Sequence, residues 1–440
     1  MTNVADRSMS LALRGLTRVA GSDTLDKIKG RRPMELLLYR GTRDGFKAIS
    51  AAGRTFSPPK KSSGKDGARL KTGSPSGQFD LTPDDEQQFL VEAVSDFAAT
   101  RLRAVAHEAE KGGIPQDLLD EAAELGLTML GVPESAGGAV TERSAVTGVL
   151  VAEALAYGDA GLAVALLAPA AVATALASWG DADQQEQYLT PFLSDDIPVA
   201  ALALAEPQAL ADPLKPQTTA KPIADGYVLN GVKALVPRGA DCDLLIVGAT
   251  IEGGGPALFI VETSRDGISV AEDPAMGLKA AKLGRIKLDN VTLPATALLG
   301  KADAAIYREC VSRSQLAWAA IGSGLTKAVR DFVVGYVNER IAFGEPISHR
   351  QAVAFMVSDI AIEHEGLRLT TLRAAARADA GSEYRREVTL ARTLARKHGM
   401  TVGSQGVQLL GGHGFIDEYP VERWYRDLRA VGVLDGIVLV

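Results

Sequence analysis

The chain has 440 residues, of which 46% are hydrophobic and 23% are charged. This composition predicts several folded domains and excludes a disordered, collagen-like or disulfide-rich protein. Cys242 and Cys310 fit neither a metal-binding nor a disulfide pattern, and the histidines never occur at metal-ligand spacing. A reducing, cytoplasmic compartment is the simplest interpretation. The longest apolar run, Leu162–Ala177, is interrupted by Pro169 and is too short to span a membrane.

The net charge of −7 is unevenly distributed. Residues 1–72 hold 16 Lys and Arg against 6 Asp and Glu, whereas the rest of the chain is acidic. We expect a basic extension over residues 1–80, with helical spacing at Ser8–Val19 and Met34–Ala52 and a Pro/Ser/Gly/Lys-rich linker. This extension suits an anionic partner or the periphery of a membrane. A solvated linker explains it equally well, and its acidic residues argue against an organelle-targeting segment.

The body of the chain divides into three segments. Residues 81–195 have helical periodicity, with a helix start predicted at Thr82 and Pro83 in its first turn. Residues 196–302 contain short β-branched or apolar runs separated by turns, which predicts a compact antiparallel sheet. Residues 303–440 form the last segment, in which helical periodicity returns and continues to about Leu410. This segregation predicts an α+β multidomain fold and excludes a doubly wound α/β fold.

The most informative segment runs from Gln408 to Asp427 and begins QLLGGHGF. Its glycines, Gly411, Gly412 and Gly414, end a helix and allow backbone N–H groups to approach an anionic ligand. An ordinary helix C-terminus is the alternative interpretation.

A second segment combines Arg340, Phe343 and Gln351 near the corner between two helices. An arginine fork, an aromatic face and an amide suit a pyrophosphate and a stacked base. A surface arginine and a core phenylalanine are the alternative.

Together, in this order, the two segments resemble the acyl-CoA dehydrogenase family, and the resemblance covers about residues 82–436. Further similar stretches are Gly126–Gly138, Ala205–Pro207, Asp225–Lys233 and Met276–Pro294. The resemblance implies an N-terminal helical domain, a central antiparallel β-barrel and a C-terminal four-helix bundle. It also implies FAD bound between subunits, an acyl-CoA substrate and a flavoprotein electron acceptor. A carboxylate in a dry pocket would remove the α-proton while the β-hydride passes to the flavin.

The residues implied to grip the ADP half of FAD are intact. In the family these residues hold the cofactor of the neighbouring subunit. The matching positions here are Arg340, Phe343, Gln351, Gln408, Gly411 and Gly412.

The catalytic-base position departs from the family. A Glu-Gly-Thr segment is expected after Arg426-Asp427, but the chain reads Asp435-Gly436-Ile437. Aspartate is one methylene shorter, and a misplacement of about 1 Å costs on the order of 10²-fold in rate. Asp435 is therefore either the base or an ordinary turn residue. The alternative base position used by some relatives is occupied by Ser314.

The flavin-ring contacts depart as well. The family's Thr-Glu-Pro…Gly-Ser-Asp stretch is Ala205–Asp212 here, without the two hydroxyls. The Trp-Ile-Thr that meets the flavin ring is Leu235-Val236-Pro237, which lacks the indole and the hydroxyl, and Pro237 has no backbone donor.

Three hypotheses follow. The chain is a subunit of a hetero-oligomeric, FAD-dependent acyl-CoA dehydrogenase that contributes ADP-side contacts to a catalytically intact homologous partner. Alternatively, it is a self-sufficient homo-oligomer that uses Asp435 as the base. Thirdly, it is a non-catalytic scaffold that binds a membrane surface through its basic extension.

Overall fold

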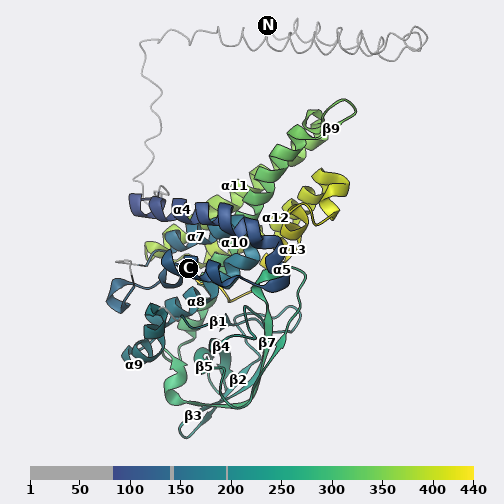
Figure 1. Cartoon of the computed structure of the whole chain (residues 1–440). Helices are drawn as coiled ribbons and strands as arrows, with labels where there is room; N and C mark the ends of the chain where they lie inside the picture. Colours follow the sequence, from purple (N-terminus) through teal and green to yellow (C-terminus); the bar gives the residue numbers. More distant parts are fainter. Residues whose placement is uncertain (1–82, 139–142, 195–196) are drawn as a thin grey trace, which may run out of the picture. The chain divides into compact units, whose positions relative to one another are not determined.

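The computed structural model describes residues 83–440, except 139–142 and 195–196. The basic extension and its two expected helices lie outside the described residues. In the described part, helices form one region, a single sheet forms the next, and long helices follow (Figure 1).

The first helices build the N-terminal region. Asp84 accepts a hydrogen bond from the Gln87 amide at 2.8 Å, and the Gln87 side chain accepts one from the Asp84 amide. This reciprocal cap starts the helix at Asp85, so the prediction of Pro83 in the first turn was wrong. The helices are α4 (Asp85–Phe97), which continues through a π-helical turn (Ala98–Leu102), α5 (Arg103–Gly112), α6 (Gln116–Glu124), α7 (Ala145–Gly158), α8 (Ala160–Trp179) and the short α9 (Ala182–Gln184).

Helix α8 corrects one expectation. Pro169 does not interrupt it, and the helix runs for 20 residues with a mean hydropathy of 2.1. By length and composition α8 could cross a membrane, and it is the one such helix among the described residues. In the structure, however, 94% of its apolar window is buried by other elements. Small side chains on α7 and α8 let both helices pack within the core.

The middle of the chain forms an eight-stranded sheet, in the order β6-β7-β3-β2-β4-β5-β8 with β1 beside β4. Most neighbouring strands are antiparallel, as predicted, but β4 pairs in parallel with β1 and with β2. The strands are β1 (Ala200–Ala203), β2 (Thr219–Ile223), β3 (Gly226–Val236), β4 (Leu244–Ile251), β5 (Pro256–Glu262), β6 (Ile268–Glu272), β7 (Gly284–Pro294) and β8 (Leu298–Leu299).

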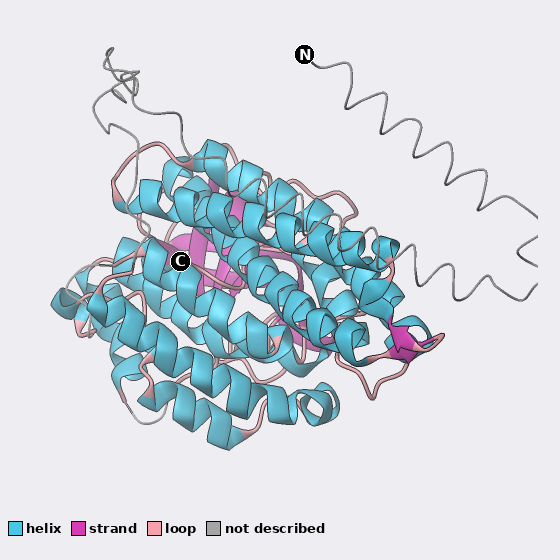
Figure 2. Cartoon of the chain, turned by 90° about the horizontal axis from the view of Figure 1, so that it is seen from above, coloured by secondary structure: helices cyan, strands magenta, loops and turns pink. Residues whose placement is uncertain are grey.

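The C-terminal region is a helical bundle around α10 (Ala304–Glu339), which also packs against α7. Its other helices are α11 (Gln351–Asp379), α12 (Arg385–Leu410) and α13 (Val421–Val431). A hairpin of β9 (Ile341–Ala342) and β10 (Glu345–Pro346) joins α10 to α11. The long helices lie side by side in Figure 2. The predicted α+β multidomain fold is therefore confirmed, whereas α13, which is short and rich in charge, was not predicted.

Candidate active site

Asp435, the candidate base, follows α13 and faces α10 and α12. Its Oδ1 atom lies 3.1 Å from Gln315 Nε2 and 3.9 Å from Arg392 Nη2. Its side chain is only 19% exposed. Burial raises the pKa of Asp435 above its ordinary value, although Arg392 and the Gln315 hydrogen bond oppose the shift. The carboxylate is buried, as a base would require, but it already has two protein partners.

The residue after Asp435 is fixed by α10. Ser314 Oγ and Trp318 Nε1 both donate to the Gly436 carbonyl, each at 2.9 Å. Ser314, the alternative base position, therefore anchors the main chain in this structure. The sequence interpretation missed Trp318, although the spacing of four residues places it on the same helical face as Ser314.

The two altered flavin-ring stretches lie next to each other. The Ala234 amide donates to the Ala205 carbonyl at 3.0 Å, which joins the end of β3 to the residues after β1. Gly436 packs against Leu204, because a Cβ atom added to this glycine would lie 2.9 Å from Leu204 Cβ. The structure thus brings the candidate base position and both ring stretches together.

Backbone donors in the second ring stretch are already used or absent. The Leu235 amide donates to Asp273 Oδ2 at 3.0 Å, and the Arg238 amide donates to the Ala281 carbonyl at 2.8 Å. Pro237 has no amide hydrogen. Leu235 has a φ of 55°, a left-handed conformation that leucine rarely adopts. The amides of Leu235 and Arg238 are therefore bonded to acceptors within the chain.

A buried ion pair includes Glu206 of the first ring stretch. Lys233 Nζ lies 2.7 Å from Glu206 Oε1, and Glu206 also accepts hydrogen bonds from the amide and hydroxyl of Thr218. Burial lowers the pKa of Lys233 to about 8, while Glu206 opposes the shift. The pair fixes the chain immediately before residues 207–212, which are mostly exposed.

A small cavity lies near residues 438–440, but Asp435 is not among the residues that line it. A cavity between α7, α8 and residues 438–440 has a volume of about 20 Å³. A site of that size holds about one water molecule. An acyl chain therefore cannot occupy it in this conformation.

The six candidate ADP-side residues lie at the other end of α10 and are all exposed. Tyr336 Oη is 2.8 Å from His413 Nδ1, so the last turns of α10 meet the turn that follows α12. Phe343 is 97% exposed, which excludes the alternative of a core phenylalanine, and Arg350 lies 5.6 Å from its ring centroid.

The glycine turn after α12 faces open space. Gly411 has a φ of 59°, a conformation in which glycine is favoured. A Cβ atom added to Gly411 or Gly412 would have no neighbour within 4 Å, whereas one on Gly414 would lie 2.3 Å from the Val407 carbonyl oxygen. The turn is therefore packed on one side and open to a ligand on the other.

The structure does not bring the two groups of candidate residues together. Gln315, beside the candidate base, and Arg340 are separated by 25 residues of α10. At a rise of 1.5 Å per residue this is about 37 Å. One bound dinucleotide therefore cannot contact both groups of candidate residues of a single chain.

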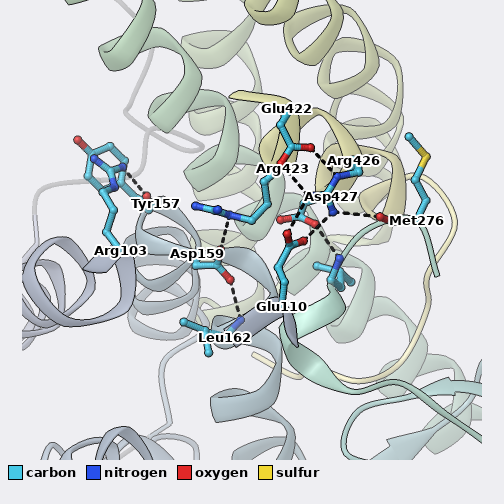
Figure 3. A network of polar contacts seen from close by, with 11 residues as sticks. Arg103, Glu110, Tyr157, Asp159, Leu162, Met276, Glu422, Arg423, Arg426 and Asp427 are labelled. Atoms are coloured by element: carbon cyan, nitrogen blue, oxygen red, sulfur yellow. Dashed lines mark hydrogen bonds and ion pairs between the residues drawn. The ribbon is translucent and has the colours of Figure 1, made fainter. Parts of the chain in front are cut away.

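A buried polar network joins the three regions near Asp427 (Figure 3). Arg423 pairs with Asp159 at 3.1 Å, and Arg426 pairs with Glu110 at 2.6 Å. Asp427 accepts a hydrogen bond from the Leu278 amide at 2.6 Å. Burial, together with the nearby Asp159, raises the pKa of Asp427 to about 7. The sequence motif contained Asp427, but its partners in the other regions could not be identified from the sequence.

Comparison with known proteins agrees with this architecture. Family models of the acyl-CoA dehydrogenase N-terminal, middle and C-terminal domains match residues 84–196, 201–291 and 305–437. The chain is 30% identical to cyclohex-1-ene-1-carbonyl-CoA dehydrogenase of Geobacter metallireducens, over 80% of this chain and 94% of that protein. It is 29% identical to an NADH-dependent acryloyl-CoA reductase of Anaerotignum propionicum, over 82% and 93% of the two chains.

A solved structure, butyryl-CoA dehydrogenase from Megasphaera elsdenii, superposes with a TM-score of 0.73 at 28% identity. The match covers 81% of this chain and 95% of that chain. The match to the C-terminal family model includes Asp435 and the glycine turn at Gly411 and Gly412. The chain belongs to the acyl-CoA dehydrogenase family of oxidoreductases.

Proposed function

We propose that this chain is a subunit of an FAD-dependent acyl-CoA dehydrogenase and contributes ADP-side contacts to a catalytically intact homologous partner. The reaction of the assembly is the α,β-dehydrogenation of an acyl-CoA thioester. FAD bound in the partner's site supplies the hydride acceptor, and a flavoprotein electron acceptor reoxidises it. This chain would supply binding groups rather than the reacting carboxylate.

The two groups of candidate residues, one near each end of α10, fit FAD unequally. Arg340 and Gln351 are exposed donors for phosphate oxygens, and the open turn at Gly411 and Gly412 leaves room for a diphosphate. At the ring position, the Leu235 and Arg238 amides are bonded within the chain. The residues therefore fit the ADP half of FAD but not its ring.

One observation carries the proposal. Gln315, beside the candidate base, and Arg340, one of the ADP-side residues, lie about 37 Å apart along α10, so the group of residues that fits FAD and the group that does not serve different cofactor molecules. A partner with an intact ring site is therefore needed.

The experiment is to purify the chain alone and together with a catalytically intact relative, and to quantify FAD per chain after denaturation. We expect little FAD on the lone chain and flavin recovery in the complex. In the complex, Arg340→Ala should lower FAD retention at least tenfold. The matched control is Arg373→Ala, which removes an exposed arginine of α11. Stoichiometric FAD on the lone chain, with normal oxidation of acyl-CoA, would refute the proposal.

The second candidate function is a self-sufficient dehydrogenase, and one observation favours it. Burial raises the pKa of Asp435, as a general base in a dry pocket requires. Activity of the lone chain that is abolished by Asp435→Asn would support this function, whereas equal turnover in that variant would exclude it. The role of the basic extension at a membrane surface concerns residues outside the described part.

A further inference from the structure

His413 differs from the other histidines of the chain in what surrounds it. The other four each lie 2.6–3.8 Å from a glutamate oxygen: His107, His349, His364 and His398. For His413, no carboxylate oxygen of the described residues lies within 4 Å of a ring nitrogen. His413 also stands in the glycine turn, between Gly412 and Gly414. A charge on this ring would therefore be available to an anion from outside the chain.

The His413 ring is held on two sides. Its Nδ1 atom lies 2.8 Å from Tyr336 Oη, near the end of α10. Its plane stacks on the Tyr419 ring, with a centroid distance of 5.0 Å and an interplanar angle of 9°. Tyr336 and Tyr419 meet edge to face at 6.1 Å, so the three rings support one another. The orientation of His413 is therefore set by the chain itself.

The second ring nitrogen of His413 is left for a ligand. Its Nε2 atom has no hydrogen-bond partner among the described residues and is not buried. Tyr336 Oη lies 3.4 Å from the Leu410 carbonyl oxygen as well as beside Nδ1. When the ring is protonated, both of its nitrogens are donors. Nδ1 then donates to Tyr336, whose hydroxyl donates to Leu410, and the Nε2 hydrogen is free to bind an acceptor.

The elements packed against the turn add positive or neutral groups near His413. Burial raises the pKa of Tyr336, and the nearby charge of Arg340 opposes the shift, so Arg340 lies close to the ring cluster. The last ten residues of α12 carry no charge. The acidic groups closest in sequence are exposed or paired with an arginine: Asp417 and Glu418 are exposed, and Glu422 of α13 pairs with Arg426. An anion at the open turn would therefore meet Arg340 and His413 together.

We propose that His413 is a proton-linked ligand for the diphosphate of FAD and that Tyr336 and Tyr419 are its positioning residues. Histidine changes its charge near neutral pH, and the charged ring donates from Nε2 to a phosphate oxygen. Binding of the diphosphate therefore takes up a proton, and the site weakens as the pH rises. This inference deepens the proposed function and rests on it only in the choice of a diphosphate ester as ligand.

The test measures the binding of ADP-ribose to the full chain by calorimetry. Both phosphates of ADP-ribose are esterified, so its charge is constant between pH 5.5 and pH 8. We expect the affinity of the unchanged chain to rise about tenfold as the pH falls from 8 to 5.5, because a charged donor forms. His413→Gln should vary less than twofold. Titrations at pH 7 in two buffers of different ionisation enthalpy should show proton uptake by the unchanged chain alone.

Two further variants separate proton linkage from structure, with each fold verified by circular dichroism. His349→Gln is the matched control, because His349 is an exposed histidine that is paired with Glu345. It should keep the pH dependence of the unchanged chain. Tyr336→Phe removes the hydroxyl that holds Nδ1, and it should weaken binding at pH 5.5 more than at pH 8. If His413→Gln does not fold, Tyr336→Phe decides.

Three results would overturn the proposal. The first is no binding of ADP-ribose by the unchanged chain at any pH. The second is the same pH dependence in the unchanged chain and in folded His413→Gln. The third is equal binding by the unchanged chain and Tyr336→Phe at pH 5.5. FAD content in the complex reports separately on the proposed function, since FAD can be recovered there without any proton linkage.

Discussion

The two ends of α10 present opposite kinds of surface. At the end near Asp435, hydrogen-bonding groups are satisfied by the chain itself: Gly436 by Ser314 and Trp318, and Leu235 by Asp273. At the other end, Arg340 and the turn at Gly411 are exposed.

A site that binds a ligand keeps polar groups available, whereas a site that has lost its ligand satisfies them internally or buries them. A ligand is therefore expected at the end with Arg340 and Gly411, where the polar groups are exposed, rather than at the end near Asp435. The difference between the two ends also predicts that substitutions near Asp435 reduce stability, whereas those at the outer end reduce binding and affect stability little.

The largest effect is expected at the buried network. Arg423→Met leaves the Asp159 carboxylate without its ion-pair partner inside the protein. Breaking a buried pair in this way costs about 3–5 kcal/mol. Chemical denaturation should report this loss, while Arg385→Met, which removes an exposed pair with Glu383, should leave the midpoint unchanged. Equal midpoints for the two variants would contradict the role assigned to the buried ion pair.

The next prediction concerns pH. The pKa of Asp427 is about 7 in the folded chain, above its ordinary value of 3.8. The folded state therefore binds more protons than the unfolded state, and this group's contribution to stability is present below pH 4 and lost as the pH rises to 7. The loss is on the order of 4 kcal/mol.

Asp427→Asn keeps an acceptor for the Leu278 amide but cannot titrate. The stability difference between this variant and the unchanged chain should vary between pH 4 and pH 7. Asp359→Asn, on the exposed face of α11, should show no such variation. A constant difference for Asp427→Asn would show that this carboxyl does not titrate in that range.

A smaller effect is expected at the Gly436 carbonyl. Combining Ser314→Ala with Trp318→Phe removes both donors and leaves a buried acceptor unpaired, which costs about 2 kcal/mol. Ser358→Ala removes an exposed hydroxyl that bonds within α11 and should be neutral. Thermal unfolding of the three proteins measures the contrast. No loss in the double variant would mean that water replaces the donors.

The smallest effect is expected at the glycine turn. Gly411→Ala should cost about 1 kcal/mol, because its φ of 59° strains an L-residue although space is available. Gly412→Ala meets nothing within 4 Å at an ordinary φ and should leave the midpoint unchanged. Both variants should weaken FAD retention in the complex if the open turn contacts the cofactor. Stability losses of equal size would contradict the role assigned to the φ of Gly411.

Much of the architecture could be predicted because it depends on local patterns. The change from helical to strand periodicity located the sheet, and the end of α12 falls at Leu410, as expected. The start at Asp85 was missed because Thr82 and Asp84 are both acceptable caps, and only the structure distinguishes them.

Contacts between distant residues could not be predicted. The partners of Asp427 come from regions separated by more than a hundred residues, and nothing local marks them. Similarly, no pattern reveals that Arg143 meets Val440. The candidate base and ADP-side residues came from motif resemblance, and their roles remain predictions.

The burial of α8 has a consequence for biosynthesis. Its stretch of mean hydropathy 2.1 leaves the ribosome long before α10, which packs against both α7 and α8. Trp179 and Ala304 are 125 residues apart. At ordinary elongation rates that delay is about 6–25 s. During this interval the nascent chain displays an apolar helical hairpin, so chaperones that bind hydrophobic segments should associate with ribosomes that have not yet translated α10.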